Sequence, residues 1–401
     1  MTLLYLWGPR PVYDWILKTW GIDPFPFVFL DTDTVMSAVR CLRDGVDVFV
    51  TNPCDFLGRL FDYSPFWLLL AGLPVTSAWL VPTGLFVVLA FFLSLLLLPV
   101  GGTMREARLI SLGAVSTPVV FAVERGNNDL VLFTLAAVAA ALACRSKGLR
   151  LVGYGAALLA GFLKYYPMTL LSLAARERPP RFALVILLVA AACGLFALAM
   201  GPELTRALRL IPTGDWFGDM FGSSTVAGGL ASLWGWPAGL RRFVHLLMVL
   251  GSVMTGAWLA LGRPAQEAVG RLDERQQAFL LVGACLILGC FFTAQNIGYR
   301  SLHLLLALPS LLALGRLAPA RRLWRWSGAA TVWLLWAEGW RHAMREVDDT
   351  SLAIRFLGWG AREILWWWVV TVLIACAAII LGRSEIVRHV LPALARRMGA
   401  A

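Results

Sequence analysis

Long uninterrupted apolar runs constrain this chain more than any other feature. Residues 83–100, 182–200 and 366–381 are long enough, or nearly so, to cross the ~30 Å hydrocarbon layer of a bilayer as helices. The chain is 59% hydrophobic and 15% charged, whereas an average soluble domain is about half apolar and a quarter charged. The sequence therefore predicts an all-α polytopic membrane protein of roughly 10–12 membrane segments, forming a single transmembrane helical domain over residues 1–401.

The net charge of +11 does not indicate a nucleic-acid-binding protein. The basic residues lie in short gaps between apolar runs, as expected for cytoplasmic loops of membrane proteins. Four scattered histidines argue against a histidine-based metal site. The predicted partners are therefore membrane lipids and lipid-linked molecules, and no nucleic acid.

The loops between the apolar runs predict an orientation. Spans are expected at 76–100, 107–123, 130–144, 182–200, 243–261, 278–294, 301–315, 326–338 and 364–382, while residues before 30 contain no clear span. The basic loops are 104–108, 145–150, 176–181, 316–326 and the tail 383–401, which are predicted to be cytoplasmic. The longer loops, rich in Trp, Gly and Asp, are 27–65, 124–129, 201–240, 295–300 and 338–363, and are predicted to face the other side.

Residues 151–175 form an apolar stretch with Lys164 and Pro167 at its middle. A central lysine costs about 2.5–3.5 kcal/mol on membrane-insertion scales, and proline interrupts helix hydrogen bonding. Two half-length helices that meet at the "KYYP" sequence and enter and leave on the same side fit both facts. Irregular backbone at that depth is tolerated where it lines a protein cavity.

The outward-facing stretch "FVFLDTDTVMSA" contains two carboxylates, Asp31 and Asp33. They fit either a solvated turn, with Asp31 or Thr32 capping a helix, or a catalytic site. A partly desolvated carboxylate can act as general base for a hydroxyl group. Hard divalent cations such as Mg²⁺ and Mn²⁺ prefer carboxylate and phosphate oxygens. A divalent cation that bridges Asp31, Asp33 and a phosphate is therefore an open alternative.

Polar residues also gather in two short segments beside the spans. In "ERGNND", the side chains of Arg125, Asn128 and Asp129 fit either a polar hairpin with internal ion pairs or a site for sugar or phosphate. Lys164 and Arg300, with His303 one turn after Arg300, fit either snorkelling cations or a phosphate site.

Three further features are weaker. Asp215 and Trp216, in the glycine-rich part of the loop 201–240, suit sugar binding, as does Tyr165 at the break. Cys41 and Cys54 lie in one polar loop, and a disulfide between them is an open alternative if that loop lies outside the cytoplasm.

The order of these motifs resembles the GT-C superfamily of integral membrane glycosyltransferases. The segments "DTDTVMSAVRCLRDGVDVF", "NPCDFLGRLFDYSP", "ERGNNDL", "GFLKYYP" and "QNIGYRSLHLLLALP" are similar to the bacterial branch that contains the polyprenyl-phosphate-mannose α-mannosyltransferases. The resemblance covers roughly residues 27–175 and the region around 295–309.

The resemblance implies an enzyme of the bacterial inner membrane that takes mannose, or another hexose or pentose, from a polyprenyl-phosphate donor. The acceptor is a glycan or glycolipid on the extracytoplasmic face, and the anomeric centre is inverted. By spacing, Asp31 matches the acidic position of the family, and Asp33 is an additional carboxylate. The implied roles are base for Asp31 with Asp33; donor phosphate binding for Lys164, Arg300, Arg125 and His303; and sugar or acceptor binding for Asn128, Asp129, Tyr165, Asp215 and Trp216.

The main alternative is a transporter or lipid flippase, since broken helices with buried charge are typical of transporters. The sequence shows no second break like "KYYP" in its C-terminal half, as an inverted repeat would predict. A glycan ligase or polymerase, or a purely structural membrane subunit, are the remaining alternatives.

Overall fold

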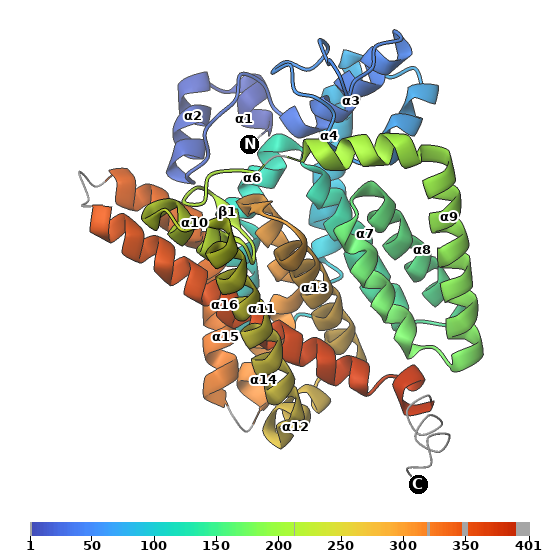
Figure 1. Cartoon of the computed structure of the whole chain (residues 1–401), viewed down its shortest axis with the longest axis vertical. Coiled ribbons are helices and arrows are strands. Elements are labelled where there is room, and N and C mark those ends of the chain that lie inside the picture. The colour runs from blue at the N-terminus through green and yellow to red at the C-terminus, as the bar shows by residue number, and fades with distance from the viewer. Residues whose placement is uncertain (1, 212, 319–320, 347–351, 390–401) are drawn as a thin grey trace.

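The long apolar runs of the sequence form helices in the computed structural model, which describes residues 2–211, 213–318, 321–346 and 352–389 (Figure 1). The helices that are long and apolar enough to cross a membrane are Ser77–Leu95, Pro179–Leu210, Ala238–Leu261, Glu274–Thr293, Gly298–Leu317 and Phe356–Gly382. The pair α5 (Met104–Ala114) and α6 (Thr117–Arg125), bent by 44°, makes a seventh if it is one span. The protein is therefore a helical, membrane-embedded chain.

Some expected spans are shorter than the ~20 residues that a perpendicular crossing needs. Helix α7 is Asn128–Ala143 and α8 is Lys147–Leu163, 16 and 17 residues long. By length and composition, the described residues contain six helices that could each cross a membrane, or seven if the bent pair is one span, whereas 10–12 membrane segments of any length were expected.

The bundle has an inner and an outer set of helices. Helices α13 (Glu274–Thr293) and α14 (Leu304–Leu317, preceded by the 3-10 helix η4, Gly298–His303) lie inside, with 78% of their apolar windows buried. In the outer helices, α4 (Leu80–Leu95), α9 (Pro179–Leu210) and α11 (Ala238–Leu261), only 6–17% of the residues in the apolar window are buried. An exposed, wholly apolar helix is compatible with lipid and not with water, so the outer set forms the lipid-facing surface.

The chain breaks at the "KYYP" sequence. Helix α8 ends at Leu163, Lys164 is extended, and the 3-10 helix η3 runs Tyr166–Arg176. The Tyr154 hydroxyl of α8 donates a 3.0 Å hydrogen bond to Glu177, just beyond η3. Helices α8 and η3 therefore lie side by side, and the chain turns back on itself at Lys164.

The N-terminal residues form short helices at the top of Figure 1. Helices α1 (Thr2–Trp7) and α2 (Arg10–Thr19) precede α3 (Leu30–Arg43), and none of the three has the length of a span. Two short 3-10 helices, η1 (Pro65–Gly72) and η2 (Ser77–Trp79), then lead into α4. A disulfide bond joins Cys41 at the end of α3 to Cys54.

The expected loop 201–240 is largely helical. Helix α9 bends at Met200, next to Pro202, and its last part runs across the top of Figure 1 to Leu210. There Ala207 packs with Ala38 and Cys41 of α3. The loop also contains the strand β1 (Met220–Phe221), helix α10 (Thr225–Trp234) and the start of α11.

Helices also enter the expected loop 338–363, because α15 extends over Arg321–Glu346 and α16 over Leu352–Gly382. The short helix α12 (Arg263–Gly270) and the strand β2 (Asn296–Ile297) complete the described elements, and β1 pairs antiparallel with β2. Residues 390–401 of the basic tail lie outside the described residues.

Candidate functional site

Asp129 is the centre of a buried polar cluster at the N-terminal end of α7. Its carboxylate accepts hydrogen bonds from Lys164 Nζ at 2.6 Å and from the Tyr166 hydroxyl at 2.5 Å. Arg300 Nε and His303 Nε2 lie 3.7 Å and 3.4 Å from the same carboxylate. We call these five residues the Asp129 cluster. They come from three separate motifs of the sequence, the "ERGNND", "KYYP" and "QNIGYRSLH" segments.

Arg300 and His303 are held by the segment that precedes α14. Asn296 in β2 donates to the backbone of Cys290 at 2.7 Å, and its side-chain oxygen accepts a hydrogen bond from Arg300. The His303 ring is fully buried, stacks on Phe133, and lies 2.8 Å from the Tyr166 hydroxyl. The short strand pairing of β1 with β2 thus fixes the direction of the arginine.

The charges in the Asp129 cluster do not cancel. Two basic side chains, Lys164 and Arg300, face the one carboxylate of the cluster, and they are 13% and 17% exposed while the side chain of Asp129 is inaccessible. Removing ions from water is costly unless opposite charges and hydrogen bonds compensate. The surplus positive charge therefore makes the cluster suited to bind one further anionic group.

Asp31 lies beside this cluster and is connected to it through Asn127. The Asn127 amide nitrogen donates to Asp31 at 2.5 Å, and its oxygen accepts from the backbone N–H of Asp129 at 2.8 Å, capping α7. One side chain thus joins the start of α3 to the start of α7. Asn127 belongs to "ERGNND", but the residue predicted from that motif is its neighbour Asn128.

The backbone before Asp31 adopts an unusual conformation. Phe29 has φ 65° and ψ 36°, a left-handed conformation that costs roughly 1–2 kcal/mol for a residue with a side chain. Its amide donates to the Glu124 carbonyl at 2.8 Å, and its buried ring occupies the space where a side chain at Gly84 would lie. Strained backbone of this kind persists where surrounding packing imposes it, and it is frequent at functional sites.

Burial raises the pKa of the Asp31 carboxyl above its ordinary value. The Arg125 guanidinium, the Asn127 hydrogen bond, Arg59 and Lys164 act in the opposite direction and do not offset the burial. A carboxylate with a raised pKa, held in position by a hydrogen bond, has the properties of a general base.

Asp33 faces another group. Its carboxylate lies 3.6 Å from Arg40 on the next turns of α3, because residues two apart on a helix point in different directions. No group of three or more His, Cys, Asp or Glu side chains suited to a metal occurs among the described residues. Asp31 and Asp33 thus have different partners, Asn127 and Arg40.

The other residues of the two motifs are placed around the site. Arg125 pairs with Glu124 at 3.1 Å and stacks over the ring of Phe25. Asn128 is buried, and its amide nitrogen has no hydrogen-bond partner among the residues that the structure describes. At the break the Tyr166 hydroxyl reaches Asp129, whereas the hydroxyl group of Tyr165, the residue predicted to bind sugar or acceptor, is buried near Ser64.

The loop 52–67 closes the site from the side of α3. Ser64 Oγ and Trp67 Nε1 donate to the backbone carbonyls of residues 162 and 163, at 2.6 Å and 3.2 Å. These carbonyls at the end of α8 have no partners within the helix. Arg59, which pairs with Asp55 at 2.9 Å, and Asp62 lie close enough to Asp31 to affect its electrostatics. These residues lie in the "NPCDFLGRLFDYSP" motif but are not among the predicted site residues.

Asp215 and Trp216 lie in a different part of the molecule. The Trp216 ring packs against Gly228 of α10, and its carbonyl accepts from Trp359 at 3.1 Å, while Asp215 bonds the backbone N–H of residue 217. Close by, Arg362 of α16 pairs with Glu338 of α15 at 2.5 Å and with Glu363 at 3.0 Å. None of the contacts of Asp215 or Trp216 given by the described residues joins the Asp129 cluster.

Comparison with protein-family models, with curated proteins and with solved structures finds no match for this chain.

Proposed function

We propose that the chain is a membrane glycosyltransferase that transfers a sugar, mannose or another hexose or pentose, from a polyprenyl phosphate to a glycan or glycolipid acceptor. The observation that carries the proposal is the pair of adjacent sites: a partly exposed cation cluster with surplus positive charge, and a buried carboxylate with a raised pKa. Glycosyl transfer from a lipid phosphate needs one group to hold the leaving phosphate and another to accept a proton.

The cation cluster has the chemistry to bind the donor phosphate. Arginine offers a planar fork that matches phosphate oxygens, and lysine acts as a point charge. Lys164 and Arg300 converge on Asp129, so a phosphate that binds beside them gains two cations already fixed in position. Their attraction increases as negative charge develops on the leaving oxygen, which lowers the barrier of the reaction.

Asp31 then acts as the general base. Its carboxylate accepts the proton from an acceptor hydroxyl, whose oxygen forms a bond to the anomeric carbon while the bond from that carbon to the phosphate oxygen breaks. Polyprenyl phosphate leaves with the electron pair, and attack from the face opposite to it inverts the anomeric centre, as in inverting glycosidic chemistry. No metal is part of this scheme.

The proposal places the site on the extracytoplasmic side of a bacterial inner membrane. The basic loops gather at the opposite ends of the helices, in keeping with cytoplasmic loops. The Cys41–Cys54 disulfide lies next to the site, and disulfides persist in oxidising compartments. Nucleotide sugars are cytoplasmic, so a site on this side needs a sugar carried by a lipid.

A direct test uses the purified chain in liposomes with polyprenyl-phosphate mannose and other polyprenyl-phosphate sugars, and follows the release of polyprenyl phosphate. Mass spectrometry of lipids that co-purify from native membranes identifies the donor class independently. Transfer, or a bound polyprenyl-phosphate sugar, supports the proposal. Movement of the intact lipid between leaflets without cleavage would instead favour the transporter or flippase.

Replacing Arg300 by Ala is expected to weaken donor binding about 10–100-fold, because a hydrogen bond to a charged group is worth about 1.5–3 kcal/mol. Acceptor binding is expected to change less. Binding of a non-transferable polyprenyl-phosphate sugar analogue measures the effect. Arg206→Ala is the control, because Arg206 pairs with Asp47 at the surface, far from Asp129. An unchanged donor affinity in Arg300→Ala would assign Arg300 a purely structural role.

On the acid side, kcat/KM for transfer is expected to fall with a midpoint above about pH 4, the ordinary pKa of a carboxyl group; we call this fall the acid limb. Asp31 must be ionised to accept a proton, and burial raises its pKa, so kcat/KM falls as the pH decreases through that raised value. Asp62, whose pKa is also raised by burial, is the control: Asp62→Asn should keep the limb. An acid limb at or below about pH 4, or one that disappears in Asp62→Asn, would exclude Asp31 as the titrating base.

A further inference from the structure

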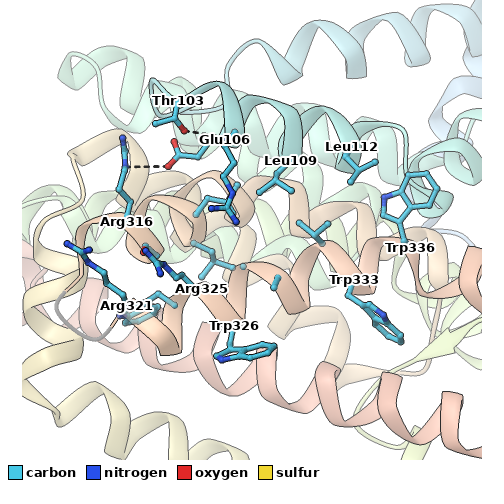
Figure 2. Close-up of a pocket in the computed structure, with 18 of the residues that line it drawn as sticks. Thr103, Glu106, Leu109, Leu112, Arg316, Arg321, Arg325, Trp326, Trp333 and Trp336 are labelled. Carbon is cyan, nitrogen blue, oxygen red and sulfur yellow. Dashed lines mark hydrogen bonds and ion pairs between the residues drawn. The ribbon is translucent and has the colours of Figure 1, made fainter.

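A large groove lies between α5, α14 and α15, away from the Asp129 cluster (Figure 2). Its volume is about 1130 Å³. Helix α14 begins at Leu304, directly after His303 of the cluster, and first lines the groove at Leu311; Arg316 lies thirteen positions, or about 20 Å, beyond His303. The arginine end of the groove therefore lies towards the opposite end of the helices, and no residue of the Asp129 cluster is among the lining residues.

One end of the groove is basic. Arg105, Arg316, Arg321 and Arg325 line it, and the labelled arginines gather at one side of Figure 2. The one carboxylate among the lining residues is Glu106, which is buried and lies 3.4 Å from Arg316. Three of these arginines thus have no acidic side chain among the residues of the groove, and they attract an anionic group.

The rest of the groove is apolar and aromatic. Leu109 and Leu112 of α5 form one wall, and Trp326, Trp333 and Trp336 of α15 form the other (Figure 2). Trp20 of α2 packs against Trp336, with 6.3 Å between the ring centroids. A groove with a cationic end and an apolar length has the polarity of a lipid: a charged headgroup followed by hydrocarbon.

The length of the groove also suits acyl chains. On α15 the lining residues run from Arg321 to Trp340, nineteen positions or about 28 Å along a helix. The part between Arg325 and Trp336 measures about 16 Å, close to half of the ~30 Å hydrocarbon thickness. A lipid whose phosphate lies at the arginines would therefore place its acyl chains along the tryptophans, within the same leaflet.

We propose that this groove binds an anionic phospholipid, whose phosphate contacts Arg316, Arg321 and Arg325 and whose acyl chains lie along Leu109 and Trp333. The lipid belongs to the leaflet opposite to the Asp129 cluster, the one that the basic loops mark as cytoplasmic. It is a separate ligand from the sugar donor, and the proposal does not depend on the transfer reaction.

The test is lipid binding to the full-length chain, delipidated in detergent and titrated with phosphatidylglycerol or with phosphatidylcholine of the same acyl chains. Native mass spectrometry measures the bound fraction. Phosphatidylglycerol is expected to bind more tightly. The double variant Arg321→Glu/Arg325→Glu is expected to lose about tenfold or more of that affinity, because each basic residue near an anionic lipid is worth about 1 kcal/mol.

Matched variants separate this site from general charge effects. Arg108 and Arg322 are exposed on the same two helices and do not line the groove, so Arg108→Glu/Arg322→Glu should keep the affinity. Ala329→Trp fills the apolar part without changing charge and should weaken binding as well. Equal binding of the two phospholipids, an equal loss in the control pair, or displacement of phosphatidylglycerol by polyprenyl phosphate at similar concentration would overturn the proposal.

These outcomes are independent of the proposed function. Donor binding and transfer, measured in phosphatidylcholine, are expected to survive in Arg321→Glu/Arg325→Glu. A chain without transferase activity can still show the phosphatidylglycerol preference, and an active transferase can lack it.

Discussion

Replacing Asp31 by Asn is expected to lower transfer by about 10²–10⁴-fold, the usual contribution of a general base. The asparagine keeps the size of the side chain and can still interact with Asn127, so the start of α3 and of α7 should stay joined. Donor binding is expected to persist, because Lys164 and Arg300 remain on Asp129. Single-turnover transfer and equilibrium donor binding, measured on the same preparation, separate the two effects.

Asp33→Asn is the matched control for this substitution. Asp33 lies on the same helical turn and is also buried, but its carboxylate faces Arg40. We expect this variant to retain most of the transfer rate. If Asp31→Asn turned over at a normal rate and Asp33→Asn did not, the base would be Asp33, and the connection through Asn127 would serve stability alone.

Replacing Asp129 by Asn is expected to destabilise the protein by about 3–5 kcal/mol, the usual cost of removing one partner of a buried ion pair. The substitution leaves Lys164 and Arg300 without their carboxylate in a part of the chain that is largely buried. Thermal or denaturant unfolding in one detergent measures the loss. Asp47→Asn is the control, because the exposed Asp47–Arg206 pair should contribute about 1 kcal/mol or less.

A second substitution tests whether charge is the cause. Lys164→Met in the Asp129→Asn background removes the uncompensated ammonium group, and it should restore part of the lost stability. A double variant that is less stable than Asp129→Asn would show that Lys164 is held mainly by other contacts, such as the nearby Tyr299 ring.

The position of the polar residues in the sequence was sufficient to predict part of the site. A lysine in an apolar stretch, followed by a proline, predicts a broken helix, and the structure breaks at Lys164. Lys164, Arg300 and His303 were predicted either to snorkel or to hold a phosphate, and in the structure all three converge on the carboxylate of Asp129. These features follow from the cost of burying charge, which does not depend on the details of packing.

Which neighbour within each motif faces the site could not be predicted in the same way. Asn127 rather than Asn128 contacts Asp31, and Tyr166 rather than Tyr165 contacts Asp129. Adjacent residues at a helix start point in directions that differ by about 100°, so a one-residue uncertainty in where α7 or η3 begins changes the residue selected. Asp33 likewise points away from Asp31, towards Arg40, because the two residues are two positions apart on one helix.

The ends of helices were the least predictable part of the fold. An apolar window marks only the part of a helix in the hydrocarbon, and α9 continues beyond Met200 as a second segment. Likewise α15 and α16 extend past their apolar windows, where Arg362 and Glu338 pair. Hydropathy alone gives no signal for such pairs, because each partner looks like a solvated loop residue until the helices meet.

The Cys41–Cys54 disulfide has a consequence for how the protein is made. It joins the end of α3, the helix that begins beside Asp31, to the loop that carries Arg59 and Asp62. Thiols of a nascent chain stay reduced in the cytosol and pair only in an oxidising compartment. On the extracytoplasmic placement that we propose for this end of the molecule, its covalent closure is therefore a late event of biosynthesis that follows translocation of the segment.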